Sequence, residues 1–147
     1  MTEATRDALL SRWFDAPVEA VWAAFTDPDQ LAQWYGPDGV SVDRDSVDVQ
    51  PRPGGPWALT MVVGDRRMPL SGTVTEVREH ERLVVTDTMP DGTLVTMTVE
   101  LREERGGTRL ELRQGPFPVS GCAGAEGAWG QAADKLAALL SSRGAPA

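Results

Sequence analysis

The stretch that decides the fold is Ala123–Ser142, AGAEGAWGQAADKLAALLSS, near the end of the chain. Its apolar residues recur at the spacing of one face of an α-helix: Trp129, Ala132, Ala133, Leu136, Leu139 and Leu140. Gly144 and Pro146 follow, and we expect them to stop the helix. No other segment carries a comparably long helical pattern, and most of the chain before it is strand-like. We therefore predict a sheet that packs one face on this helix, because the apolar face of a sheet needs a partner.

The apolar stripe of this helix is narrow and rich in alanine, which is not typical of a helix buried on all sides. Small side chains on the inner face leave room for a gap between the helix and the sheet. We expect any ligand-binding site to lie in that gap.

Length and charge limit the class of protein. The chain has 147 residues, which is enough for one domain with a real core, and we expect a single domain over residues 1–147 with its core at about 8–142. The formal net charge is −8. This charge argues against binding to nucleic acid, which depends on clustered Lys and Arg, and against an anionic membrane surface.

The cellular compartment is also constrained. Cys122 is the only cysteine, so no internal disulfide is expected. The first ten residues, MTEATRDALL, lack the basic and then apolar layout of a signal peptide. No apolar run approaches the ~20 residues that span a bilayer. We expect a cytoplasmic protein without a membrane partner; the oligomeric state is left open.

The chain before the long helix predicts one strand, two short helices and then antiparallel strands. A strand at 8–14 precedes a helix at about 17–26, and a second short helix begins after Asp27, a good N-cap. From 40 onward the residues alternate between apolar and polar, which is typical of an antiparallel sheet with one solvated face. We expect a bulge near 44–46, a bend at Gly72 and a loop over 115–121. The fold class is therefore α+β.

Residues for common catalytic and metal sites are missing or badly placed. His80 is the only histidine and lies in a polar turn, so neither a histidine-based zinc cluster nor a histidine-dependent triad is expected. Cys122 has no identifiable base nearby and is interpreted as a small buried residue. No phosphate-binding glycine motif occurs. We expect no metal, no cofactor and no catalytic residue that the sequence alone can name.

Several motifs in register resemble those of a known family. They are Phe14-Asp15-Ala16-Pro17, Val21-Trp22, Phe25-Thr26-Asp27-Pro28, Leu31, Trp34 and Gly36-Pro37; then Arg52-Pro53-Gly54-Gly55-Pro56-Trp57, Gly72, Thr75-Glu76-Val77 and Glu81-Arg82-Leu83-Val84-Val85-Thr86; then Gly106-Gly107-Thr108, Glu126-Gly127 and Trp129. The chain resembles the SRPBCC (START-like) superfamily, in the branch named after the activator of the heat-shock protein 90 ATPase. The resemblance implies a helix-grip fold, in which a curved antiparallel sheet wraps around a long C-terminal helix and a cavity lies between them.

The cavity is the candidate site, and its expected lining comes from the second short helix, the sheet and the long helix. The candidate ligand-binding residues are Trp34, Tyr35, Trp57, Leu59, Met61, Leu70, Val95, Met97, Leu112 and Trp129. Methionine adapts its shape at low cost, and tryptophan offers a stacking surface with one N–H donor. The same residues also suit a filled core, so a ligand pocket and a packed core remain alternatives.

Polar residues on the same elements would add specificity if they faced inwards: Arg12, Glu76, Asp87, Gln114 and Glu126. Their direction is left open, because the strand phase is uncertain after the expected bulge and at Gly72.

Three functions follow from the fold that the resemblance implies. The first is binding or carriage of a small, mainly apolar or aromatic molecule. The second is an enzyme like the polyketide cyclases and aromatases, which would use a cavity carboxylate: Glu76, Asp87 or Glu126. The third is a co-chaperone-like protein-interaction module, although we expect no room in this chain for the additional N-terminal domain of the eukaryotic co-chaperone. One fold hosts many chemistries, so the site must decide among them.

Overall fold

The structure is a computed structural model that describes residues 3–89 and 92–144. Within these ranges the elements follow one another in this order: β1 (Thr5–Phe14), α1 (Val18–Thr26), α2 (Pro28–Trp34), β2 (Ser41–Val49), β3 (Pro56–Val63), β4 (Arg66–Arg78), β5 (Arg82–Thr88), β6 (Leu94–Glu104), β7 (Gly107–Pro118) and α3 (Val119–Gly144). The predicted order of one strand, two short helices, a run of strands and one long helix is confirmed.

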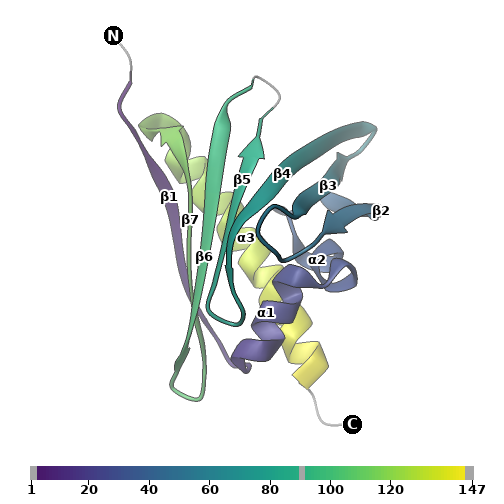
Figure 1. The fold of residues 1–147 in the computed structure, drawn as a ribbon, viewed down its shortest axis with the longest axis vertical. Helices are drawn as coiled ribbons and strands as arrows, with labels where there is room; N and C mark the ends of the chain where they lie inside the picture. Colours follow the sequence, from purple (N-terminus) through teal and green to yellow (C-terminus); the bar gives the residue numbers. More distant parts are fainter. Residues whose placement is uncertain (1–2, 90–91, 145–147) are drawn as a thin grey trace.

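The described strands form one seven-stranded antiparallel sheet in the order β1-β7-β6-β5-β4-β3-β2. The sheet is curved, and α3 crosses behind it while α1 and α2 lie beside the C-terminal half of α3 (Figure 1). This is the helix-grip fold of an α+β protein.

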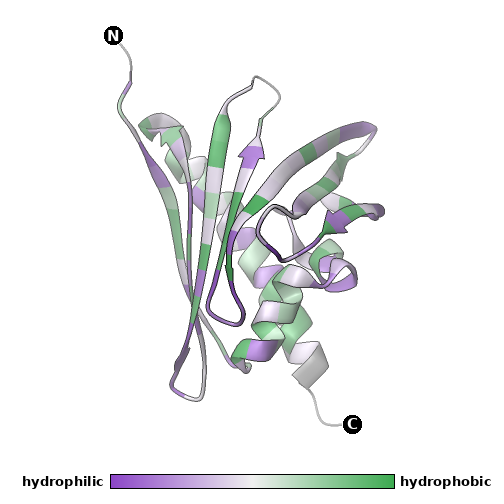
Figure 2. Cartoon of the chain, viewed as in Figure 1, coloured by the Kyte–Doolittle hydropathy of each residue, from purple (hydrophilic) through white to green (hydrophobic). Residues whose placement is uncertain are grey.

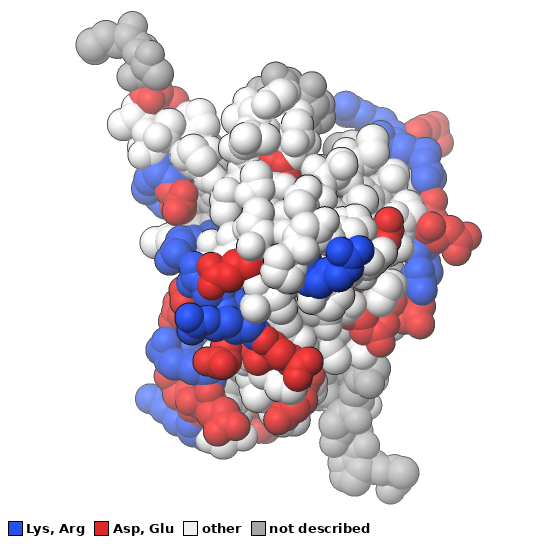
Figure 3. All heavy atoms as spheres, in the orientation of Figure 1, with Lys and Arg blue, Asp and Glu red and all other residues white. Residues whose placement is uncertain are grey.

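Alternating side chains give the sheet two different faces. Hydrophobic and hydrophilic positions alternate along β5, β6 and β7, and the ends of the hairpins are hydrophilic (Figure 2). The inward side chains pack on α3, and the outward ones include charged pairs between neighbouring strands, such as Arg82 with Glu100 at 2.9 Å and Arg109 with Glu104 at 2.6 Å. Figure 3 shows charges of both signs gathered over the lower part of β6 and β7 and along the opposite edge, with few in the middle. One solvated face is what the alternation predicts.

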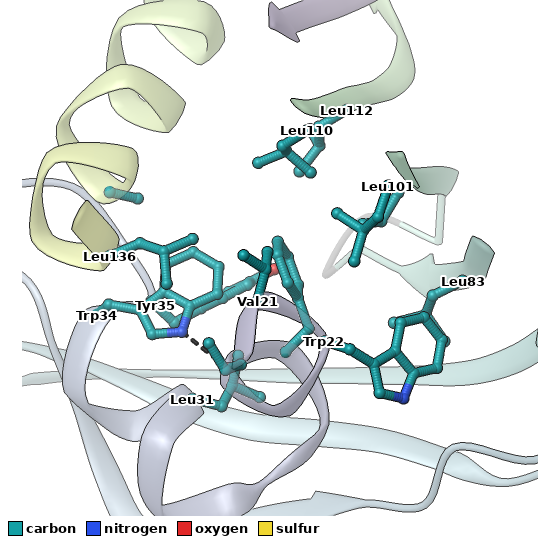
Figure 4. Close-up of a cluster of buried hydrophobic side chains, with 14 of the residues drawn as sticks. Val21, Trp22, Leu31, Trp34, Tyr35, Leu83, Leu101, Leu110, Leu112 and Leu136 are labelled. Atoms are coloured by element: carbon teal, nitrogen blue, oxygen red, sulfur yellow. Dashed lines mark hydrogen bonds between the residues drawn. The ribbon is translucent and has the colours of Figure 1, made fainter. Parts of the chain in front are cut away.

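Aromatic side chains of α1 and α2 fill one end of the space between sheet and helix. The indole N–H of Trp34 donates to the carbonyl oxygen of Ala24 at 2.8 Å, and the Trp34 and Phe25 rings meet edge to face with centroids 4.8 Å apart. Leu31, Trp34 and Leu136 belong to the same buried cluster (Figure 4). Burial of each large apolar side chain contributes about 1.5–3 kcal/mol, so this cluster fixes both short helices against α3.

The predicted bulge in β2 is confirmed. Its pairing with β3 shifts between Asp43 and Asp48, and within this segment the hydroxyl of Ser46 accepts from the backbone N–H of Thr60 at 2.8 Å. The side chain thereby pairs a backbone donor that the interrupted ladder would leave unbonded.

No register shift marks the bend expected at Gly72. Gly72 pairs regularly with Asp87 of β5, and the register of β4 and β5 shifts later, between Val74 and Glu76. A Cβ at this position would overlap Oδ1 of Asp87 and would lie 2.8 Å from the carbonyl oxygen of Thr86. Gly72 therefore leaves space for a neighbouring side chain.

The predicted loop over 115–121 is wrong. Strand β7 continues to Pro118 and α3 begins at Val119. Pairing with β1 overrides the local signal, because Gly115 and Pro116 sit in a bulge opposite Asp7, between the pairs Ala8–Gln114 and Arg6–Phe117. A bulge accommodates a proline, which has no N–H for the ladder.

Candidate functional site

A cavity of about 190 Å³ lies between the sheet and the middle of α3, and it is partly open to solvent. Its wall combines the end of α2, the segment that follows α2, four strands or strand ends, and α3. The lining residues are Tyr35, Gly36, Pro37, Met61, Leu70, Asp87, Met89, Gln114, Ala128, Trp129 and Ala132. Of the alanines in the α3 stripe, Ala132 lines the cavity, together with Ala128 from outside the stripe.

Four of the ten predicted site residues line this cavity: Tyr35, Met61, Leu70 and Trp129. The other six are buried in the core and do not line it: Trp34, Trp57, Leu59, Val95, Met97 and Leu112. All ten lie on core-facing positions, but aromatic residues of α1 and α2 fill one end of the interior and leave the space at the other. The alternation of apolar and polar residues predicts which face of the sheet a side chain occupies. It does not predict where along the strand α3 crosses, and therefore not which inward side chains line the cavity.

The sequence reasoning missed most of the remaining lining. Ala132 belongs to the recognised stripe, and Met89 continues the inward series of β5 after Leu83, Val85 and Asp87. No bulge is expected in this segment, so the alternation of inward residues along β5 predicts that Asp87 faces the interior. Gly36 and Pro37 carried no such signal, because they lie in an irregular segment.

Trp129 and Tyr35 form an aromatic wall of the cavity. Their rings meet edge to face with centroids 5.5 Å apart. The indole N–H of Trp129 donates to Oε1 of Gln114 on β7 at 2.8 Å, which ties α3 to the sheet. Because the amide oxygen of Gln114 accepts this bond, the NH₂ group of its side chain is the donor end of the amide.

The segment 36–40 is held to α3 at three points. The Lys135 ammonium donates to the carbonyl oxygens of Pro37 and Val40 at 3.2 and 3.4 Å, and Oε1 of Gln131 accepts from the backbone N–H of Asp38 at 3.0 Å. Since Pro37 lines the cavity, these bonds fix one wall of the site.

Asp87 is the unusual group of the site. Asp87 is 1% exposed, and its Oδ1 has no hydrogen-bond partner among the described residues. Burial raises the pKa of this carboxyl from 3.8 to about 6, because a low-dielectric environment disfavours the charged form. A carboxyl with such a pKa changes its charge close to neutral pH.

Tyr35 lies close enough to Asp87 to sense its charge. Burial, and then the nearby Asp87, raise the pKa of the Tyr35 hydroxyl, so this group stays a neutral phenol. The indole N–H of Trp57 has no hydrogen-bond partner among the residues described. The indole N–H of Trp57 nevertheless lies close enough to the Tyr35 hydroxyl to offset part of this rise in pKa.

The other polar candidates do not face the cavity. Glu126 pairs with Arg6 at 2.9 Å, and the hydrogen bond from Arg6 lowers the pKa of the Glu126 carboxyl. Glu76 pairs with Arg82 at 2.9 Å on the outer face, and Arg12 pairs with Asp134 of α3 at 2.7 Å. Of the five residues whose direction was open, Asp87 and Gln114 line the site.

The described residues hold no cluster of three or more His, Cys, Asp or Glu side chains that could bind a metal ion. Cys122 is fully buried, and its thiol lies 3.5 Å from the carbonyl oxygen of Arg6. His80 packs edge to face on Trp22 with ring centroids 6.2 Å apart. Neither side chain lines the cavity.

An open antiparallel sheet that grips a long helix and encloses a cavity between them defines a START-like domain. Residues 15–141 match the family described as Activator of Hsp90 ATPase homolog 1-like protein. The chain belongs to this family. The fold is generally a scaffold for binding or carrying ligands.

Solved structures agree with this assignment. A protein from Chromobacterium violaceum is 26% identical with a TM-score of 0.83, covering 91% of this chain and 96% of its own. The AHSA1 protein from Silicibacter pomeroyi is 30% identical with a TM-score of 0.81, covering 94% of this chain and 99% of its own. CalU16 from Micromonospora echinospora, at 23% identity and a TM-score of 0.65 over 96% of this chain and 88% of its own, shares the fold. No curated protein matches the sequence.

Among the residues that the structure describes, no helix is both long enough and apolar enough to cross a membrane.

Proposed function

We propose that the protein binds or carries a small, mainly apolar or aromatic molecule in the cavity between the sheet and α3. The observation that carries this proposal is an apolar cavity whose wall includes the buried carboxyl of Asp87. One oxygen of this carboxyl has no hydrogen-bond partner among the described residues, and a buried polar group without a hydrogen bond costs about 1–3 kcal/mol. Because Asp87 lines the cavity, a ligand that carries a donor or a cation compensates for the burial of this carboxyl.

The size of the cavity limits the molecule. The volume is about 190 Å³, and an apolar cavity of roughly 150 Å³ is known to bind benzene. One aromatic ring or a short aliphatic body therefore fits inside, between Trp129, Met61 and Leu70. The opening allows a longer molecule to extend into solvent.

Native mass spectrometry of freshly purified protein, followed by organic extraction, tests the proposal directly. We expect a small molecule at one copy per chain. Ala132→Leu tests the location, because a larger side chain at this cavity-lining position takes up the space. We expect this variant to fold and to lose the molecule.

Ala138→Leu is the matched control, since Ala138 lies on the same helix and is exposed. It should retain the molecule. A folded Ala132→Leu protein that still carries the molecule at full occupancy would contradict the proposed site.

Asp87 also supports a second candidate, an enzyme like the polyketide cyclases and aromatases. A carboxyl with a pKa of about 6 beside an apolar cavity suits general acid or base work near neutral pH. Its two rivals for this role, Glu76 and Glu126, are paired with arginines outside the cavity. If the molecule extracted from Asp87→Asn differs chemically from that of the native protein, turnover is the better description; an identical molecule favours carriage.

The co-chaperone-like module has less structural support. Large exposed apolar side chains among the described residues are Leu9, Val63, Leu94 and Val119, which come from four different elements. A protein-docking surface is typically a contiguous apolar patch. The family name alone names no partner of this chain.

A further inference from the structure

We propose that the molecule in the cavity is an organic amine, whose ammonium group pairs with the carboxylate of Asp87 while its apolar or aromatic body lies against Trp129 and Met61. This inference rests on the proposed function, namely that the cavity binds a small molecule, and it specifies the chemical class.

Asp87 lacks a counter-charge. A buried carboxylate needs a cation or must take up a proton, and among the described residues that line its cavity there is no arginine, lysine or histidine. Two basic side chains at α3 are occupied elsewhere. Lys135 is held by the carbonyl oxygens of Pro37 and Val40, and Arg12 by Asp134. A ligand ammonium supplies the cation that the chain leaves out.

Other features of the cavity wall also suit a cation. Aromatic faces attract cations through their quadrupoles, and Tyr35 and Trp129 both line the cavity. The phenolic oxygen of Tyr35 accepts a hydrogen bond from an ammonium as readily as it donates one. The net charge of −8 draws cations rather than anions towards the protein.

The opposite ligand class, organic anions, does not suit the cavity. A carboxylate or phosphate in this cavity would meet the charge of Asp87 with no basic side chain to offset it. Like charges in a low-dielectric site repel strongly. The cavity therefore selects against organic acids of the same size.

Three probes of similar shape separate charge, hydrogen bonding and apolar contact: 2-phenylethylamine, 2-phenylethanol and propylbenzene. Isothermal titration calorimetry of the full chain at pH 7.5 compares them. We expect the amine to bind at least about tenfold more tightly than the alcohol or the hydrocarbon, since only the amine neutralises the buried carboxylate.

Asp87→Asn removes the charge and keeps the shape. We expect it to abolish the preference for the amine and to leave propylbenzene binding within about twofold of the native value, because the apolar wall is unchanged. Glu76→Gln is the matched control: it removes one negative charge from the outer face, where Glu76 pairs with Arg82, and should keep the preference.

A pH series on the native protein tests the same point without a variant. Among the described residues of the cavity wall, Tyr35 is the other titratable group, and it stays neutral over this range. Below the pKa of Asp87, about 6, affinity for the amine should fall about tenfold per pH unit, because protons compete with the ammonium. Propylbenzene affinity should not change.

Equal affinity for the alcohol and the amine, or an amine preference that persists in Asp87→Asn, would overturn the inference while the binding function stands. The proposed function itself fails on a different result: none of the three probes binds and extraction yields no molecule.

Discussion

Gly72 of β4 lies directly opposite Asp87 of β5, and the absence of a side chain at Gly72 leaves the space that the Asp87 carboxyl occupies. The pair joins a backbone feature to the polar group of the cavity. The Asp87 carboxyl lies over β4, the strand that neighbours β5, and this places it at the edge of the cavity.

Gly72→Ala should therefore disturb both the fold and the site. The new methyl group overlaps Oδ1 of Asp87 and crowds the carbonyl oxygen of Thr86. Overpacking of this kind costs about 1–3 kcal/mol, and we expect a loss of unfolding free energy of this size in urea denaturation. Ser71→Ala, at the exposed neighbouring position, should change it by less than about 0.5 kcal/mol. Equal stability of the two variants would show that the carboxyl does not need this space.

Asp87→Asn should make the ligand-free protein more stable at neutral and higher pH. Burial raises the pKa of Asp87 from 3.8 to about 6, so the folded state binds this proton more tightly than the unfolded state. The native carboxyl therefore lowers stability as the pH rises from about 4 to about 6, by at most about 3 kcal/mol. Below pH 4 the contribution vanishes, because both states are protonated.

Thermal unfolding of both ligand-free proteins between pH 4 and pH 8 measures this effect. The difference in stability, variant minus native, should grow across pH 4–6 and then stay constant. A difference that is independent of pH would mean that Asp87 titrates normally.

The sequence was sufficient for the order of elements, the long helix and its inward stripe. Trp129, Ala132 and Leu136 are buried as their helical spacing predicts, because a single period runs through a regular helix. Local signals failed where pairing partners decide the structure. The strand through Pro116 exists because β1 lies beside it, and no property of 115–118 alone indicates that neighbour.

The sequence predicts which side chains face the interior of the fold, but it does not predict where in the interior the cavity lies. The series Leu83, Val85 and Asp87 gives the direction of Asp87 within one regular strand. Glu76 could not be placed in this way, since the register shift after Val74 changes the phase of β4. The depth of the cavity depends on where α3 crosses the sheet and on how far the aromatic residues of α1 and α2 fill the interior.

Trp129→Ala should weaken both folding and binding. The side chain is 8% exposed, packs on Tyr35 and donates to Gln114. Truncation of a buried tryptophan costs about 3–5 kcal/mol, and the wall of the cavity is lost with it. Urea denaturation gives the first effect, and calorimetry with propylbenzene gives the second.

Trp129→Phe separates the two contributions of the indole. It keeps an aromatic wall and removes the donor to Gln114, so a loss of about 1 kcal/mol in stability is expected.

Unchanged propylbenzene affinity in a folded Trp129→Ala protein would count against this site.

Lys135→Met should loosen the segment 36–40 while it leaves the rest of the fold intact. The ammonium holds the carbonyl oxygens of Pro37 and Val40, and methionine has similar length but no donor. Loss of hydrogen bonds from a charged donor costs about 1–3 kcal/mol locally. Hydrogen exchange should therefore accelerate at Gly39 and Val40 more than in β5 or β6.

Arg12→Met is the control for Lys135→Met. It also removes one positive charge that contacts α3, but Arg12 pairs with the exposed Asp134 and not with the segment 36–40. Exchange at Gly39 and Val40 should keep its native rate in this variant. Since Pro37 lines the cavity, a loosened segment should also speed ligand release, and the dissociation rate of 2-phenylethylamine should rise in Lys135→Met alone. Equal exchange rates in the two variants would mean that Gln131, which accepts from the backbone N–H of Asp38, holds the segment without the lysine.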